Sequence, residues 1–181
     1  MTCIVGLKTE KGIYIGGDSA IASDENLIQT MADPKVWKKG QFIFGYAGTL
    51  RVGQVIKYNL KIPPVNNREP TEYMVTAFVD AMRKILKKAG AAREEHKEEE
   101  QSNQFLVGFR GHLFEIDSVY SVCEIADEFV SIGSGTEYAL GSLHTTKDLD
   151  PDYRIQKALE ASSHFSSWVA PPFHTVKLKT K

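Results

Sequence analysis

The residue that follows the initiator methionine, Thr2, could act as a nucleophile with its own base. Thr2 opens a short apolar run with no arm in front of it once Met1 is removed. An unperturbed α-amine titrates near about pH 7.7 to 8.0, so the freed amine could accept the hydroxyl proton as the oxygen attacks a carbonyl. The hydroxyl would still need positive charge nearby to favour its deprotonated form, so a lysine with a counter-ion is expected.

The composition predicts a single domain over residues 1–181. The chain has 181 residues, of which 42% are hydrophobic and 25% are charged, enough for one sizeable core. Its net charge of -1 gives no overall attraction to phosphate backbones or anionic membranes, so neither nucleic acid nor a membrane is expected as a partner.

The two cysteines, Cys3 and Cys123, form neither a disulfide framework nor a zinc pattern, which fits a reducing cytoplasm. The start of the chain lacks the basic region of a signal peptide, and no apolar run is long enough to span a membrane. We therefore expect a cytoplasmic protein. The histidines and carboxylates show no metal-ligand spacing and no phosphate-binding loop follows a strand, so no metal or cofactor is expected.

Apolar periodicity and turn residues predict the order of the elements. The predicted strands are Thr2–Lys8, Gly12–Gly17, Val36–Trp37, Gln41–Phe44, Gln104–Phe109, His112–Asp117, Val119–Ile125, Phe129–Ile132 and Phe173–Lys179. The predicted helices are Leu50–Leu60, Thr71–Ala89, Ser134–Leu143, opened by a capping box, and Asp150–Phe165, opened by an N-cap and proline. The stretch Ser19–Pro34 is polar, and Ala91–Asn103 is interpreted as a solvated helix end or loop.

This order does not alternate strand and helix as a doubly wound fold does. It favours the α+β class, with two antiparallel β-sheets sandwiched between helix layers in four layers, αββα.

Five sequence blocks occur in an order that resembles the proteasome β-subunit family of N-terminal-nucleophile (Ntn) hydrolases. They are Thr2, Gly16-Gly17-Asp18-Ser19-Ala20, Asp33-Pro34-Lys35-Val36-Trp37, Phe44-Gly45-Tyr46-Ala47-Gly48 and Ser131-Ile132-Gly133-Ser134-Gly135. Length and the ending Phe173-His174-Thr175 make the chain most similar to the compact bacterial peptidase that forms a double ring capped by an AAA+ unfoldase. The resemblance extends from Thr2 to about Leu178.

The resemblance implies a set of catalytic residues. Thr2 would be the nucleophile, Asp18 would orient the terminus, and Lys35 would pair with Asp18 and lower the proton affinity of the Thr2 amine and hydroxyl. The backbone N–H of Gly45 would face the oxyanion. Ser134 would relay protons to the amine. Without the other residues, each has an ordinary structural interpretation: Asp18 would be a turn aspartate, Lys35 an exposed strand residue and Ser134 a helix N-cap.

Substrate side chains are expected to meet a small group of residues near the nucleophile, namely Ile21, Met31, Lys35, Gly45, Gly48 and Thr49. Ile21 and Met31 predict an apolar pocket. In the last helix, His164 stands where many family members have an aspartate that supports the nucleophile. A histidine there could tune the proton affinity of the amine, although a packed or solvated side chain is the more ordinary interpretation.

Three functions remain open at this point. The first is that of a threonine endopeptidase that cleaves unfolded polypeptides. Such a protein would assemble itself into a homo-oligomeric ring or double ring and would have an AAA+ unfoldase as its partner. The second is a catalytically inactive proteasome-like ring or scaffold subunit, which a retained Met1 would favour. The third is an amidase acting on small molecules, because a fold does not fix its substrate.

Overall fold

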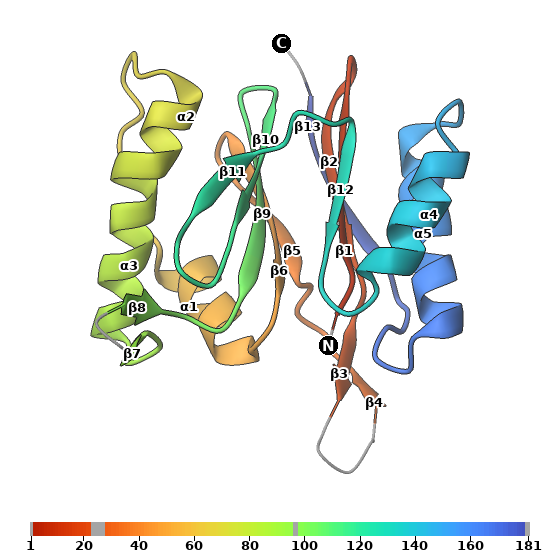
Figure 1. Cartoon of the computed structure of the whole chain (residues 1–181), viewed down its shortest axis with the longest axis horizontal. Helices are drawn as coiled ribbons and strands as arrows, with labels where there is room; N and C mark the ends of the chain where they lie inside the picture. Colours follow the sequence, from red (N-terminus) through yellow and green to blue (C-terminus); the bar gives the residue numbers. More distant parts are fainter. Residues whose placement is uncertain (1, 23–27, 96–97, 180–181) are drawn as a thin grey trace.

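Two antiparallel β-sheets lie face to face, and helices cover the outer face of each (Figure 1). The computed structural model describes residues 2–22, 28–95 and 98–179. Within these ranges the first sheet has the strand order β12-β1-β2-β13, and the second has the order β11-β10-β9-β6-β5. The predicted four-layer αββα arrangement is therefore confirmed.

The first sheet is built from β1 (Ile4–Thr9), β2 (Gly12–Gly17), β12 (Phe129–Ile132) and β13 (His174–Lys179). The second is built from β5 (Val36–Lys39), β6 (Phe42–Ala47), β9 (Gln104–Phe109), β10 (His112–Ile116) and β11 (Val122–Glu124). The first sheet is covered by α4 (Thr136–Thr145) and α5 (Pro151–Phe165). The second is covered by α1 (Leu50–Asn59), α2 (Pro70–Tyr73), the π-helical turn η1 (Met74–Phe78) and α3 (Val79–Lys88).

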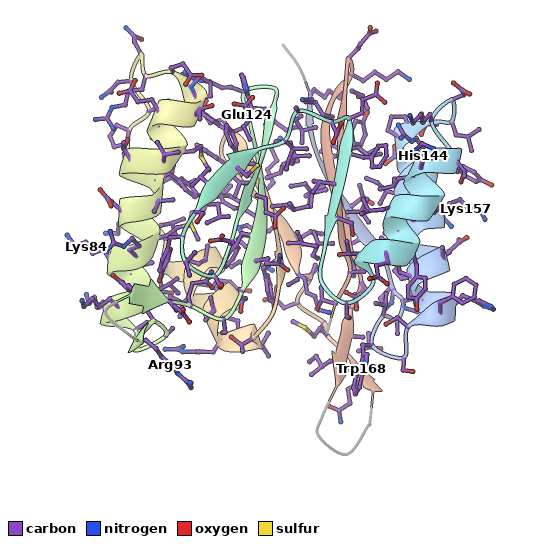
Figure 2. All side chains as sticks on the ribbon, viewed as in Figure 1. Lys84, Arg93, Glu124, His144, Lys157 and Trp168 are labelled. Carbon is purple, nitrogen blue, oxygen red and sulfur yellow. The ribbon has the colours of Figure 1, made fainter. Side chains whose placement is uncertain are left out.

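Apolar side chains fill each of the three spaces between the layers (Figure 2). Between the sheets, Ile4 and Ile15 pack with Ile43 and Leu106. Aromatic rings dominate the space between the second sheet and its helices, where Phe42 and other rings stack on one another. Charged side chains such as Lys84 and Lys157 point outward from the helices (Figure 2). The central strands β1, β2, β6 and β9 are thus buried on both faces over most of their length, which fixes their register.

The predicted helix Thr71–Ala89 is present as the continuous run of α2, η1 and α3. Within this run Val75 is 47% exposed, although its three-and-four spacing from Phe78 and Val79 predicts that it lies on the buried face. The π turn places one more residue in this turn, so the buried face runs through Met74 and Phe78 instead.

Two parts of the chain differ from the predicted elements. The polar stretch before Lys35 contains a hairpin of β3 (Ala20–Ala22) and β4 (Ile28–Thr30). The charged segment interpreted as a helix end or loop contains β7 (Arg93–Glu95) and β8 (Glu98–Glu100). This second prediction was wrong because a charge run can pair as a hairpin when a neighbour supplies the opposite charge. Glu99 receives a hydrogen bond from the Arg83 guanidinium of α3 at 2.9 Å.

No helix in the described part of the chain has both the length and the apolar character needed to cross a membrane.

Candidate active site

Sheet pairing brings Thr2 and Asp18 together. β1 and β2 are antiparallel with Ile4 opposite Gly17, so the residues before β1 lie beside those after β2. The carboxylate of Asp18 accepts hydrogen bonds from the backbone N–H of Cys3 at 3.0 Å and of Ala20 at 2.8 Å. These bonds fix the carboxylate beneath the start of β1 and satisfy a group that is 0% exposed.

Lys35 joins the hydroxyl of Thr2 to the carboxylate of Asp18. Its Nζ donates to Thr2 Oγ1 at 2.9 Å and to the two Asp18 oxygens at 3.0 Å each. Lys35 is 3% exposed, so this is a buried ion pair whose charges both have hydrogen-bond partners. Burial lowers the pKa of the Lys35 ammonium, and the charge of Asp18 opposes that shift.

Ser134 contacts the backbone of Thr2. The N–H of Thr2 donates to Ser134 Oγ at 3.1 Å, and the hydroxyl donates to the carbonyl oxygen of Thr2 at 3.3 Å. The turn that carries Ser134 requires Gly133, which has φ +94°, and a Cβ there would lie 2.3 Å from the Thr2 carbonyl oxygen.

The helix after this turn is not capped by Ser134. Gly135 is the N-cap of α4, without a side-chain cap bond, so the predicted capping box is wrong. The hydroxyl faces Thr2 instead of the helix.

A pocket of about 400 Å³ opens beside the Thr2 hydroxyl. Most of its wall is apolar, from Ala20, Ile21, Met31 and Leu50. The other lining residues are Thr2, Lys35, Tyr46, Gly48, Thr49 and Ser102. The structure therefore brings the predicted binding residues Ile21, Met31, Gly48 and Thr49 to one place.

Gly45 does not line this pocket. It lies inside β6, opposite Val36 on one side and Leu106 on the other. A Cβ on Gly45 would lie 2.5 Å from Ile4 Cγ2 and 2.9 Å from Ile15 Cγ2, in the apolar space between the sheets. The glycine therefore allows the two sheets to approach each other, and placing it among the substrate-facing residues was an error. Gly48, three residues later, lines the pocket.

His164 also lies away from the nucleophile. It is exposed and packs its ring edge-on against Phe165, with 4.6 Å between the ring centroids. The inward position near the end of α5 belongs to Ser162, which is 0% exposed. Ser162 Oγ accepts a hydrogen bond from Cys3 Sγ at 3.3 Å, and burial raises the pKa of that thiol. Ser162 falls four residues after Ala158 on the apolar face of the helix, so periodicity could have identified it.

Two further residues, Ser19 and Asn103, support the site through contacts that no local sequence pattern indicates. Ser19 Oγ donates to the carbonyl oxygen of Pro172 at 2.6 Å, and Ser19 N–H donates to that of Ala170 at 3.0 Å, so the loop before β13 packs beside Asp18. Asn103 contacts the backbone of Thr49 at the rim of the pocket.

No three His, Cys, Asp or Glu side chains among residues 2–22, 28–95 and 98–179 converge on a point that could hold a metal ion.

The state of Met1 is the one part of the predicted site that lies outside the described residues. The N–H of Thr2 described above is that of the chain with Met1 attached.

No protein-family model matches the chain. In sequence, it is 26% identical over 169 residues to the ATP-dependent protease subunit HslV of Caldicellulosiruptor saccharolyticus, covering 90% of this chain and 89% of that protein.

Solved structures share the whole fold. Thiobacillus denitrificans BPH in complex with epoxomicin has a TM-score of 0.83 at 15% identity, with 99% of both chains covered. Eukaryotic HslV from Trypanosoma brucei has a TM-score of 0.69 at 17% identity, with 98% of this chain and 99% of that chain covered. The sequence similarity to bacterial HslV and the shared Ntn-hydrolase fold together support the resemblance of the chain to the proteasome β-subunit family.

Proposed function

We propose that the protein is a threonine endopeptidase that uses the hydroxyl of Thr2 as its nucleophile once Met1 has been removed. The observation that carries the proposal is the contact of 2.9 Å between Lys35 Nζ and Thr2 Oγ1, made by a lysine that is buried and paired with Asp18. A structural ion pair would not need to include the hydroxyl of the second residue. An ammonium at this distance favours the alkoxide and lowers the proton affinity of a neighbouring amine.

The first step forms a bond between Thr2 Oγ1 and the carbonyl carbon of the substrate. The free α-amine of Thr2 takes the hydroxyl proton, and the carbonyl electron pair moves onto its oxygen. Ser134, at 3.1 Å from the Thr2 nitrogen, is placed to carry protons to and from that amine. Collapse of the tetrahedral intermediate breaks the C–N bond, the leaving amine takes the proton, and water then hydrolyses the Thr2 ester.

The oxyanion of the intermediate needs a hydrogen-bond donor at the pocket. We assign this role to the backbone at Gly48, because Gly48 lines the pocket beside Thr2 and Gly45 does not. A glycine lets the substrate carbonyl approach the main chain closely.

We also propose that the protein works as a homo-oligomeric ring or double ring in the cytoplasm, with an AAA+ unfoldase that delivers unfolded polypeptides. The sequence relative is described as an ATP-dependent protease subunit, which supports a partner of this kind. Exposed rim residues such as Thr49 and Ser102 leave the pocket open on a single chain, so enclosure by assembly would restrict access to unfolded substrates.

The test compares three purified proteins: the wild type, Thr2→Ala and Thr2→Ser. Each is assayed for oligomeric size and for hydrolysis of a fluorogenic peptide and of unfolded casein. We expect hydrolysis by the wild type, none by Thr2→Ala, and activity within about 100-fold of wild type for Thr2→Ser, which keeps the hydroxyl and amine. Hydrolysis by Thr2→Ala would contradict the mechanism, and an assembled wild type with Met1 removed but no activity would favour the scaffold function.

A further inference from the structure

The side-chain amide of Asn103 binds both polar groups of the Thr49 backbone. Asn103 Oδ1 accepts from Thr49 N–H at 2.7 Å, and Asn103 Nδ2 donates to the Thr49 carbonyl oxygen at 3.0 Å. Asn103 Oδ1 also accepts from the hydroxyl of Thr49 at 3.1 Å. Only a group with a donor and an acceptor side by side can make both backbone bonds.

Asn103 is itself held in the same way by Gln101. Gln101 Oε1 accepts from Asn103 N–H at 2.7 Å, and Gln101 Nε2 donates to the Asn103 carbonyl oxygen at 2.5 Å. Gln101 Nε2 also donates to the carbonyl oxygen of Asp117 at 2.9 Å. Both amide side chains are buried, and the two bonds between Gln101 and Asn103 are made away from water, while the bonds to Thr49 and Asp117 are partly buried. Two amides in series therefore anchor Thr49 to the loop that follows β10.

The segment held by Asn103 is the one that faces the nucleophile. Gly48 has φ +131°, and a Cβ there would lie 2.4 Å from Asn103 Oδ1 and 2.5 Å from the Ser102 carbonyl oxygen. Thr49 is the N-cap of α1, but its side chain makes no cap bond and turns toward Ser102 and Asn103. The hydrogen bonds from Asn103 thus hold the start of α1 in place of an N-cap side-chain bond, and Gly48 packs directly on the Asn103 amide.

We propose that Asn103 is a positioning residue for peptide hydrolysis, and that it holds the Gly48–Thr49 turn in the geometry that stabilises the tetrahedral intermediate. This inference rests on the proposed function. Asn103 does not line the pocket, so its effect is on the backbone and not on the bound side chain. Its loss should lower kcat far more than it changes KM, because the misplaced group acts in the transition state.

The first variant is Asn103→Leu, which keeps the approximate shape and removes both backbone bonds. We expect kcat for a fluorogenic peptide to fall about 100-fold, while KM changes less than about 3-fold. The matched control is Gln104→Leu on the next residue. The amide of Gln104 donates to Glu115 Oε1 at 3.1 Å and has no contact with the Gly48–Thr49 turn, so kcat should stay within about 2-fold of wild type.

The second variant, Asn103→Asp, tests the same proposal in case the Asn103→Leu protein does not fold. The ionised carboxylate of this variant accepts from Thr49 N–H but donates nothing to the Thr49 carbonyl oxygen, whereas the protonated acid can make both bonds. Burial raises the pKa of such a carboxyl. The kcat of Asn103→Asp relative to wild type should therefore rise at least about 5-fold as the pH is lowered from about 8 to about 5.5. The same ratio for Gln104→Glu should stay flat.

Wild-type hydrolysis in the same assay separates the two proposals. If the wild type is active and the folded Asn103 variants keep its kcat, or raise only KM, the role of Asn103 is refuted and the threonine peptidase stands. A pH-independent ratio for Asn103→Asp also refutes it. If the wild type with Met1 removed is inactive, the proposed function fails, and the catalytic role of Asn103 fails with it.

Discussion

The ammonium nitrogen of Lys35 lies 2.9 Å from the hydroxyl oxygen of Thr2 and 3.0 Å from the carboxylate of Asp18, and Lys35 and Thr2 both line the apolar pocket. Residues that precede β1, follow β2 and precede β5 meet at this point. A buried lysine that binds both a carboxylate and a hydroxyl could serve the fold, the chemistry or both, and variants can separate these roles.

Replacing Lys35 should abolish activity and also weaken the fold. In Lys35→Met the Asp18 carboxylate stays buried without its cation, which is expected to cost about 3–5 kcal/mol of unfolding free energy. Peptide hydrolysis should fall by about 1,000-fold or more, because the hydroxyl loses its charged neighbour. Denaturant unfolding and steady-state kinetics measure the two effects.

The double variant Lys35→Met/Asp18→Asn separates them. Removing both charges leaves no unpaired buried ion, so most of the lost stability should return while activity stays absent. Recovery of hydrolysis in the double variant would show that the lysine serves only the fold.

Ser134→Ala should lower activity with little change in stability. The Ser134 hydroxyl accepts a hydrogen bond from Thr2 N–H and donates one to the Thr2 carbonyl oxygen. It does not cap α4, because the N-cap of that helix is Gly135. We expect kcat to fall about 10- to 100-fold and the unfolding free energy to change by about 1 kcal/mol or less. Thr136→Ala is the matched control, because its hydroxyl donates to the Gly133 carbonyl oxygen in the same turn without touching Thr2. A Ser134→Ala protein with wild-type kcat would exclude the proton relay.

The pH dependence of kcat/KM should be bell-shaped. On the acid side, the amine of Thr2 must lose a proton to act as a base, so activity rises with pH through the pKa of the amine. The charge of Lys35 should hold that pKa below its usual range of about 7.7 to 8.0. On the alkaline side, activity falls as Lys35 loses its proton, and burial lowers the pKa of Lys35 below its usual value of 10.5. A profile with no alkaline limb below that value would argue against a protonated Lys35 in the reaction.

The pocket should favour peptides with an apolar side chain next to the scissile carbonyl. Met31 is buried in its wall, so Met31→Glu should lower kcat/KM for a leucine-containing peptide by about 10- to 200-fold. Gln29→Glu adds the same charge at an exposed position of β4 outside the pocket and should have little effect. Equal losses in both variants would mean that charge, and not the pocket, determines the change.

Local patterns in the sequence were enough to predict most of the fold. The hairpin of β9 and β10 follows from alternation around a glycine turn, and α5 begins where Asp150 accepts a hydrogen bond from Asp152 N–H at 3.0 Å. The order of the elements then left few ways to bury both sheets.

The site was predictable only in part, because its contacts join distant residues. Ser134 fits a capping box locally, and its contact with Thr2, 132 positions away, decides its orientation. Gly45 and Gly48 lie in one short block, and only the pairing of β6 with its neighbours shows which of them faces the pocket. Asn103 has no local pattern at all, since its role depends on the approach of Thr49.

The most direct test of the central claim is the intact mass of the purified protein before and after incubation with a peptide epoxyketone such as epoxomicin. This reagent reacts with the hydroxyl and the amine of an N-terminal threonine together, so it reports both halves of the proposed nucleophile. We predict a mass that lacks Met1 and one adduct per chain, absent in Thr2→Ala. A chain that lacks Met1, is folded and assembled, and still forms no adduct would contradict the proposal that Thr2 is the nucleophile.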